Sequence, residues 1–153
     1  MAQTANLPLS QNEMRQNSMS YKYIIDAYAW IEYFKASKSG AIAREYIEND
    51  HSATPTIVIS EISRKLQKEI ILGNETQEGR LKRLEFIRAT TKIVDLDFET
   101  AAEAGKINED LKEKAKGWGL ADSIVLCTAR SFKGKVVTGD EHFRELQEVI
   151  FIK

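Results

Sequence analysis

The sequence predicts an α/β protein, a three-layer α/β/α sandwich around a mainly parallel sheet of four or five strands. From Ser20 onward, short β-rich runs alternate with helical segments. Strands separated by helices pair in parallel through right-handed crossovers, which places helices on the faces of the sheet. With 153 residues and no internal repeat or long linker, the chain is expected to form one domain with a substantial core.

Four runs rich in β-branched and aromatic residues are the predicted strands. They span residues 21–25, 92–96, 135–138 and 149–152. Such runs, bounded by turn residues or by a helical pattern, are typical of strands. We expect all four to lie in one sheet.

The segments between these strands repeat apolar residues at helical spacing. Amphipathic helices are predicted at 29–34, 42–47, 59–70, 81–87 and 104–115. A break is expected at Pro55, because the residue before a proline avoids the helical region. The segment 124–129 is apolar nearly all round and predicts a central buried helix, in which Cys127 is an inert packing residue.

Composition excludes several classes of protein. Lys and Arg number 22 against 23 Asp and Glu, a formal net charge of −1, which excludes a uniformly basic nucleic-acid binder but leaves a locally basic groove open. One cysteine and two histidines argue against a disulfide framework and a structural zinc site. No apolar run approaches the roughly 18–20 residues needed to cross a bilayer. We therefore expect a soluble cytoplasmic protein.

The first eighteen residues differ from the rest. They are rich in Gln and Asn, contain one of the two prolines, and show no period. They also lack the basic start and apolar centre of a secretory signal. Residues 1–18 are therefore interpreted as a tail or as a leader preceding the natural start, and residues 19–153 as the domain.

Four acidic residues occupy the positions where an open parallel sheet binds its ligands, beyond the carboxyl ends of the strands. Asp26 follows the first strand directly, Asp140 follows the strand at 135–138, and Glu61 and Asp122 are expected at helix starts. Each of the last three also has a structural interpretation. Asp122 and Asp140 are suited to cap helix N-termini, and Glu61 is suited to complement a helix dipole.

The four carboxylates together favour a metal site. At one sheet edge they would repel one another, and some would be driven to protonate. A divalent cation removes this conflict, and all-oxygen ligation suits Mg²⁺ or Mn²⁺. One or two such ions activate water and neutralise charge in phosphodiester cleavage.

The acids lie in four segments that resemble the PIN-domain ribonucleases, and most nearly the VapC-type toxins of prokaryotic toxin–antitoxin pairs. The segments are IIDAYAWI at 24–31, SEI at 60–62, LADSIVLCTAR at 120–130 and VTGDEHF at 137–143. The resemblance covers about residues 20–153, and it rests on the ordered set of motifs at these separations.

The resemblance implies a metal-dependent endoribonuclease that uses Mg²⁺ or Mn²⁺. It implies an acidic quartet of catalytic and metal-binding residues, namely Asp26, Glu61, Asp122 and Asp140. Asp26 and Asp122 are then the expected direct ligands, and Thr138 is a supporting hydroxyl. The sequence departs from the pattern at Ala27, where many members carry Ser or Thr, which removes hydroxyl assistance there. Members commonly dimerise and are neutralised by a small antitoxin, so the expected partners are RNA, a cognate antitoxin and a second copy of the chain.

Further residues are weaker candidates. Arg64, Lys65 and Lys68 follow Glu61 on its helix and are suited either to grip RNA phosphates or to form a solvated face. Trp118 is a candidate for stacking on an RNA base. His142 is interpreted as an ordinary helix residue, because the metal route needs no histidine. A proton donor beside Asp140 is the alternative.

Two other functions remain open. One is a non-catalytic PIN-like module that binds RNA or protein. The other is a phosphoryl-transfer domain with Asp26 as nucleophile, which is disfavoured because no second acid flanks Asp26 and no lysine ends a later strand. A nucleotide-binding module is weaker still, because no glycine-rich loop follows a strand.

Overall fold

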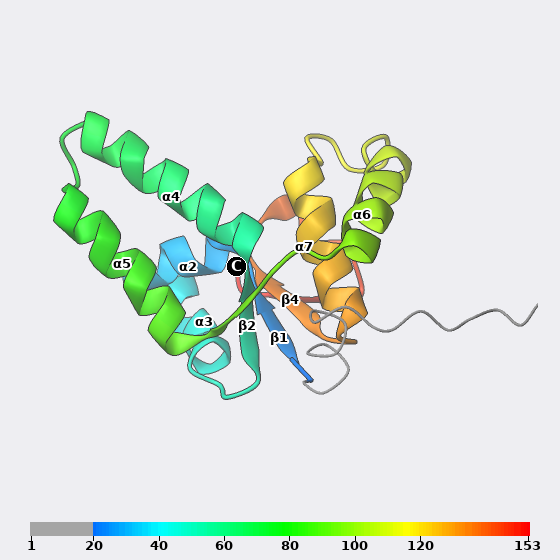
Figure 1. Ribbon diagram of the computed structural model, residues 1–153, viewed down its shortest axis with the longest axis horizontal. Helices are drawn as coiled ribbons and strands as arrows, with labels where there is room; N and C mark the ends of the chain where they lie inside the picture. Colours follow the sequence, from blue (N-terminus) through cyan, green and yellow to red (C-terminus); the bar gives the residue numbers. More distant parts are fainter. Residues whose placement is uncertain (1–19) are drawn as a thin grey trace, which may run out of the picture.

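A computed structural model describes residues 20–153, so the predicted tail at 1–18 lies outside the described residues. Within them the chain forms a five-stranded sheet in which every pairing is parallel, in the order β3-β2-β1-β4-β5 (Figure 1). The strands are β1 (Tyr23–Ile25), β2 (Ser52–Pro55), β3 (Lys92–Val94), β4 (Lys135–Thr138) and β5 (Val149–Phe151). The predicted fold class is confirmed.

The strand β2 is the one that the sequence pattern did not predict. Its four residues, SATP, lack large apolar side chains, yet all four are buried between β1 and β3. The hydroxyl of Thr54 is satisfied inside the protein, since it accepts a hydrogen bond from Trp30 Nε1 at 3.1 Å and lies 2.7 Å from the hydroxyl of Thr91. Burial by neighbouring strands, and not intrinsic propensity, makes this segment a strand.

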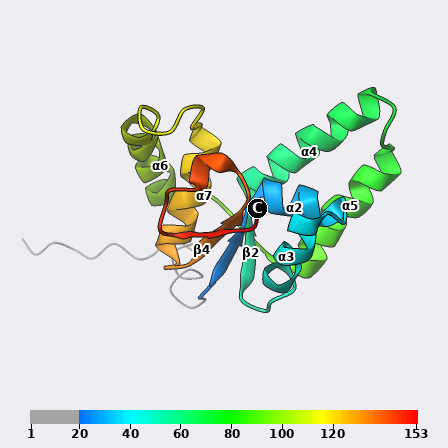
Figure 2. The same ribbon diagram turned by 180° about the vertical axis from the view of Figure 1, so that it is seen from behind.

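Helices cover both faces of the sheet. On one face lie α2 (Ala27–Phe34), α3 (Lys38–Ile47), α4 (Thr56–Ile71) and α5 (Gln77–Thr90). On the other lie α6 (Phe98–Leu111) and α7 (Leu120–Ser131), as Figures 1 and 2 show from opposite sides. A short 3₁₀ helix, η1 (Glu141–Phe143), follows β4. Among residues 20–153, no helix combines the length and the apolar character that crossing a membrane requires.

The helix α4 begins earlier than the sequence pattern indicated. Pro55 ends β2 and is itself the N-cap residue, with an extended backbone (φ −65°, ψ 146°) from which the helix starts at once. Proline is tolerated there because the first helical N–H groups have no intrahelical acceptor. Glu61 therefore lies in the second turn of α4 and not at its start.

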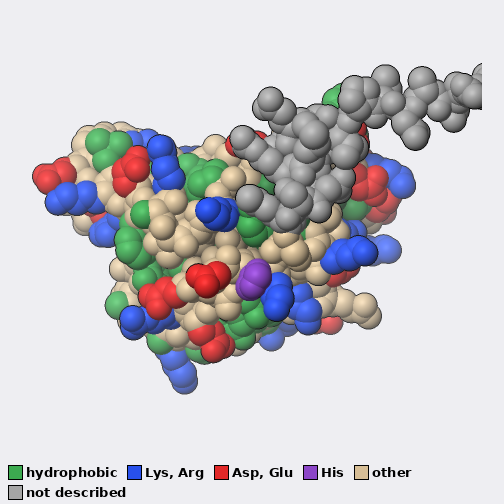
Figure 3. Space-filling model, turned by 60° about the horizontal axis from the view of Figure 1, so that its bottom comes forward, with side chains coloured by type: hydrophobic (Ala, Val, Ile, Leu, Met, Phe, Trp, Pro, Cys, Tyr) green, Lys and Arg blue, Asp and Glu red, His purple; other side chains and the backbone are tan. Residues whose placement is uncertain are grey.

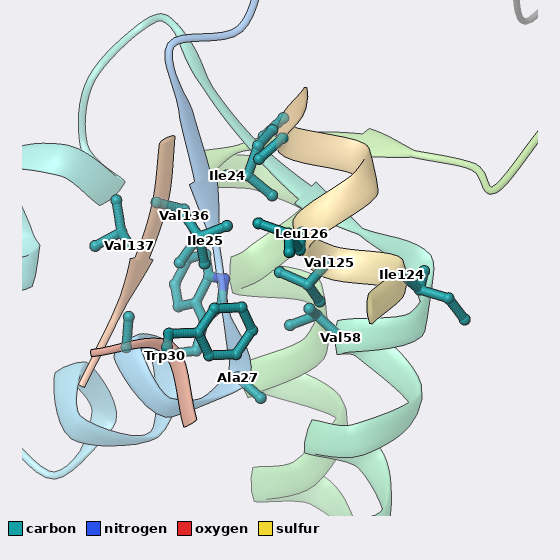
Figure 4. Close-up of a cluster of buried hydrophobic side chains, with 14 of the residues drawn as sticks. Ile24, Ile25, Ala27, Trp30, Val58, Ile124, Val125, Leu126, Val136 and Val137 are labelled. Carbon is teal, nitrogen blue, oxygen red and sulfur yellow. The ribbon is translucent and has the colours of Figure 1, made fainter. Parts of the chain in front are cut away.

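The core lies on both sides of β1 and β4 (Figure 4). Ile24, Ile25, Val136 and Val137 are fully buried in these two strands. Residues 123–129 of α7 are all buried, as the apolar pattern predicted, and this includes Cys127. This rigid centre holds the carboxyl ends of β1 and β4 and the start of α7 in fixed positions.

Candidate active site

The order in which strands are added to the sheet reverses between β1 and β4, although the two strands are parallel. From β1 the chain builds the sheet outward through β2 to β3, and it then crosses back to place β4 on the other side of β1. At such a reversal the connections leave the two strand ends on opposite faces and open a crevice between them, where ligands bind. Ile25 pairs with Val137, so the residues that follow, Asp26 and Thr138, lie side by side at this edge.

Asp26 is buried, with 5% of its surface exposed. It is the N-cap residue of α2, but its side chain makes no capping hydrogen bond. Instead Oδ2 accepts a hydrogen bond from the hydroxyl of Thr138 at 2.8 Å. The pKa of Asp26 is raised to about 6, mainly by burial and in smaller part by the charges of Asp122 and Asp140, while hydrogen bonds from Thr138 and the Ala27 backbone oppose the rise. The fold therefore holds this carboxylate in a buried position that disfavours its charged form.

Thr138 links two of the predicted acids. Its fully buried hydroxyl donates to Asp26 and accepts a hydrogen bond from the backbone N–H of Asp140 at 3.0 Å. A hydroxyl can do both at once because it carries one donor and two lone pairs. The expected supporting position of Thr138 therefore has a structural basis, since it sets the orientation of the Asp26 carboxylate relative to Asp140.

Asp122 and Asp140 both cap helices. Asp122, the third residue of α7, accepts a hydrogen bond from Gly119 N–H at 3.0 Å, and Asp140 accepts one from His142 N–H at 3.0 Å. Each capping bond uses one oxygen, so further lone pairs remain on each carboxylate. Burial raises the pKa of Asp122, the Gly119 bond lowers it, and the charge of Asp140 raises it again.

Glu61 faces the same edge from the second turn of α4. Its pKa is raised to about 7, mainly by burial and in smaller part by the charges of Asp26 and Asp122, while Arg64 and Lys65 oppose the rise. The dipole interpretation does not fit this position, because the dipole effect falls off within the first turn. The structure therefore corrects the predicted helix-start position of Glu61, and it still places Glu61 within electrostatic reach of Asp26 and Asp122.

The assembled donor set fits a hard divalent cation. Asp26, Glu61 and Asp122 influence one another electrostatically at this edge, and the pKa of each is raised above its ordinary value. Of the four acids, Asp122 and Asp140 have carboxylate oxygens within 4.8 Å of each other and of a His142 ring nitrogen. Carboxylate oxygens are the ligands that Mg²⁺ and Mn²⁺ prefer. The opposite edge, at the amino ends of the strands, carries acidic and basic side chains interspersed (Figure 3).

His142 lies beside two of the acids, and its contact with Asp122 was not predicted from the sequence. Its Nδ1 lies 3.2 Å from Asp122 Oδ2 and 3.5 Å from Asp140 Oδ1. The tight turn of η1 brings the ring back toward Asp140, but the approach to Asp122 joins residues twenty positions apart. The spacing Asp-x-His was the local signal available, and the contact with α7 depends on the tertiary fold.

Trp118 is a packing residue. It is 6% exposed, its Nε1 donates to the hydroxyl of Ser123 at 2.7 Å, and its ring centre lies 4.9 Å from that of Phe143. This burial does not fit the predicted role of stacking on a base. The indole packs between α7 and η1, against Ser123 and Phe143.

The three predicted basic residues line a groove of about 590 Å³ between α2, α4 and α5. The apolar side chains of Ile31 and Phe34 also line it. So do Lys35 and Arg83 and the acidic residues Glu69 and Glu75, of which Glu75 forms an ion pair with Arg83. The groove adjoins the acidic edge, since Arg64 and Lys65 act electrostatically on Glu61. A surface of this kind offers both cations and apolar contacts next to the carboxylates.

The chain belongs to the PIN domain family, whose sequence profile matches residues 23–149. A comparison with functionally curated proteins found no match.

Solved structures of toxin–antitoxin proteins have the same fold. A toxin–antitoxin complex from Klebsiella pneumoniae is 18% identical, with a TM-score of 0.65 over 86% of this chain and 98% of that one. DNA-bound VapBC from Salmonella typhimurium is 18% identical, with a TM-score of 0.67 over 87% and 99%. VapC20 from Mycobacterium tuberculosis, a toxin that cleaves the sarcin–ricin loop, is 12% identical, with a TM-score of 0.67 over 84% and 97%.

Proposed function

We propose that this protein is a metal-dependent endoribonuclease, the toxin of a toxin–antitoxin pair that acts in the cytoplasm. The observation that carries the proposal is the meeting of Asp26, Glu61, Asp122 and Asp140 at the carboxyl edge of the sheet, with pKa values of about 6 and 7 for Asp26 and Glu61. Such a cluster of acids opposes folding unless a cation binds it. The test is RNA cleavage that requires a divalent metal ion and the Asp26 carboxylate.

The carboxylates are proposed to have different roles in hydrolysis. Asp26 and Asp122 are the proposed direct ligands of Mg²⁺ or Mn²⁺, with Asp140 completing the set. The ion, when bound, supplies Lewis-acid stabilisation of the developing negative charge and lowers the pKa of water. Thr138 holds the Asp26 carboxylate in one orientation. Among the described residues Glu61 has no hydrogen-bond or ion-pair partner, so its carboxylate is available to accept a proton from the attacking water.

We propose that RNA reaches these acids along the groove lined by Arg64, Lys65 and Lys68. Replacing the three by Gln is expected to weaken RNA binding and to reduce the slope of log affinity against log salt by about 2, because each lost phosphate contact removes about 0.7 on single strands. The measurement is fluorescence anisotropy with labelled RNA at several salt concentrations, in an Asp26→Asn background so that the RNA is not cleaved.

Three lysines at the amino edge provide a matched control for this experiment. Lys22, Lys92 and Lys135 are exposed at or beside the beginnings of strands, and replacing them by Gln changes the net charge equally. The proposed path predicts that this control leaves the slope within about 0.5 of the parent value. Equal effects from both triple variants would contradict a specific path through the groove.

We propose two protein partners. One is a cognate antitoxin, as the names of the neighbouring VapBC structures suggest. The other is a second copy of the chain, because the α4–α5 hairpin leaves Ile71, Leu72 and Leu81 exposed, and Ile87 is the one buried residue of α5. Sedimentation equilibrium is expected to give a dimer at high micromolar concentration. A species of 17.4 kDa under those conditions would count against the dimer.

A further inference from the structure

His142 brings a nitrogen donor to a cluster that is otherwise made of oxygens. One ligand atom from each of Asp122, Asp140 and His142 lies within 4.8 Å of the others. Two separate parts of the chain supply them, the start of α7 and the turn after β4. The tertiary fold, and not one local sequence motif, therefore brings the three donors together.

The chain holds the imidazole with its Nδ1 edge toward the acids. The backbone N–H of His142 donates a hydrogen bond to Asp140 Oδ1, which fixes the backbone from which the imidazole extends. On the other side Gly117, at φ +81°, approaches the ring so closely that a Cβ there would lie 2.8 Å from Nε2. The side chain is one-third exposed, so the ring is partly enclosed while solvent still reaches the site.

The separations of the donor atoms match those around one ion. Metal–ligand bonds of about 2.1 Å in octahedral geometry place neighbouring ligand atoms about 3 Å apart. The Nδ1 of His142 lies 3.2 Å from Asp122 Oδ2 and 3.5 Å from Asp140 Oδ1. All three atoms therefore fit adjacent positions on a shared cation with little rearrangement.

We propose that His142 Nδ1 is a direct ligand of the divalent ion at this site, together with Asp122 and Asp140, and that this nitrogen makes the site prefer Mn²⁺ to Mg²⁺. The inference rests on the proposed function, in which a metal ion binds here, and it adds a ligand and a choice of metal. Mg²⁺ takes oxygen ligands, whereas first-row transition ions accept imidazole.

A positioning role for His142 makes different predictions. In that role Nδ1–H would donate to Asp122 and hold the carboxylate in place, as partners of metal ligands commonly do. Its loss would then weaken Mn²⁺ and Mg²⁺ binding equally, and no nitrogen would contact the ion. The two roles are separated by a spectroscopic signal from the ligand nitrogen.

The test is pulsed electron paramagnetic resonance of the full chain loaded with Mn²⁺. Direct ligation predicts electron-spin-echo modulation from a bound ¹⁴N nucleus, and growth with ¹⁵N-histidine changes this modulation without any substitution. The signal is expected to vanish in His142→Phe and His142→Gln. It should persist in His51→Gln, because His51 is exposed in the loop before β2. Bound Mn²⁺ that shows no imidazole nitrogen coupling would overturn the assignment.

Binding constants from calorimetry give a second readout. His142→Phe is expected to weaken Mn²⁺ binding by about tenfold or more, and to change Mg²⁺ binding by less than about threefold. Equal losses for both ions would overturn direct ligation and leave the proposed nuclease standing. Wild-type protein that binds neither ion would contradict both proposals. His142→Gln serves as the second variant if the phenylalanine disturbs folding.

Discussion

Replacing Asp26 by Asn is expected to abolish RNA cleavage and metal binding and, in metal-free protein at pH 7, to stabilise the fold. The substitution keeps the volume, and the Asn carbonyl is able to accept the Thr138 hydrogen bond. It removes a buried charge whose pKa is raised from 3.8 to about 6. The gain in unfolding free energy is up to about 3 kcal/mol, because one pKa unit corresponds to about 1.4 kcal/mol.

The loss of cleavage should be large. A metal ion contributes several kcal/mol of charge stabilisation in the transition state, and about 4 kcal/mol corresponds to a thousandfold decrease in rate. Urea unfolding in EDTA measures the stability, and calorimetry measures the metal affinity. A metal-free variant that is less stable than the wild type would contradict the account of Asp26.

Asp97 offers a matched control for this variant. It is also a buried Asp that follows a strand, but its side chain caps α6 by accepting a hydrogen bond from Thr100 N–H at 2.8 Å. Asn caps helices as well as Asp does, so Asp97→Asn should change stability by less than about 0.5 kcal/mol. It should also leave metal affinity and cleavage unchanged, which separates the loss of a site carboxylate from the loss of any buried carboxylate.

The second large effect is expected in the pH dependence of metal-free stability. The pKa of Asp26 rises from 3.8 to about 6, and that of Glu61 from 4.5 to about 7. The folded protein therefore holds these protons more tightly than the unfolded chain does. Their stabilising contribution is complete below the unfolded pKa values and is lost as the pH rises through the folded ones. Stability in EDTA should fall between about pH 4.5 and 7.

The structure specifies a minimum size for this decrease in stability. Asp26 alone contributes a loss of about 2 kcal/mol over this range, because about 1 kcal/mol of its total of about 3 kcal/mol is lost below pH 4.5. Glu61 and Asp122 act in the same direction. The lowered pKa of the exposed Glu141 has the opposite sign, but it acts below pH 4.5. Thermal unfolding across this pH range is the measurement. The double variant Asp26→Asn, Glu61→Gln should give a clearly shallower decrease, because only the contribution of Asp122 remains. A wild-type stability that rises with pH in EDTA would refute the account.

The sequence predicted the fold class because most of its elements carry a strong local signal. Residues 124–129 are apolar nearly all round, and the strands at 92–94 and 135–138 contain β-branched residues. The strand β2 could not be predicted in this way. Its small and polar residues become a strand because the neighbours β1 and β3 supply both hydrogen-bonding edges, and this information is not local.

The candidate site was predictable to a similar extent. The four acids follow from strand ends and helix starts, and the structure brings them to one edge. The sequence interpretation set capping against metal binding as alternatives for Asp122 and Asp140. In the structure both carboxylates cap and still face the site, because a carboxylate has lone pairs for both tasks. His142 and Trp118 were misjudged because their environments depend on α7, which packs beside them only in the folded chain.

The central claim, that these acids hold a metal ion that is required for cutting RNA, is tested most directly by cleavage of mixed-sequence RNA. Wild-type protein and Asp26→Asn are compared with Mg²⁺ or Mn²⁺ present and with EDTA in excess, and Asp97→Asn serves as the control. The account predicts cleavage by wild type and Asp97→Asn with either metal ion, none in EDTA, recovery when metal is restored, and none by Asp26→Asn. Equal cleavage by wild type and Asp26→Asn, with or without EDTA, would contradict it, as would no cleavage under any condition.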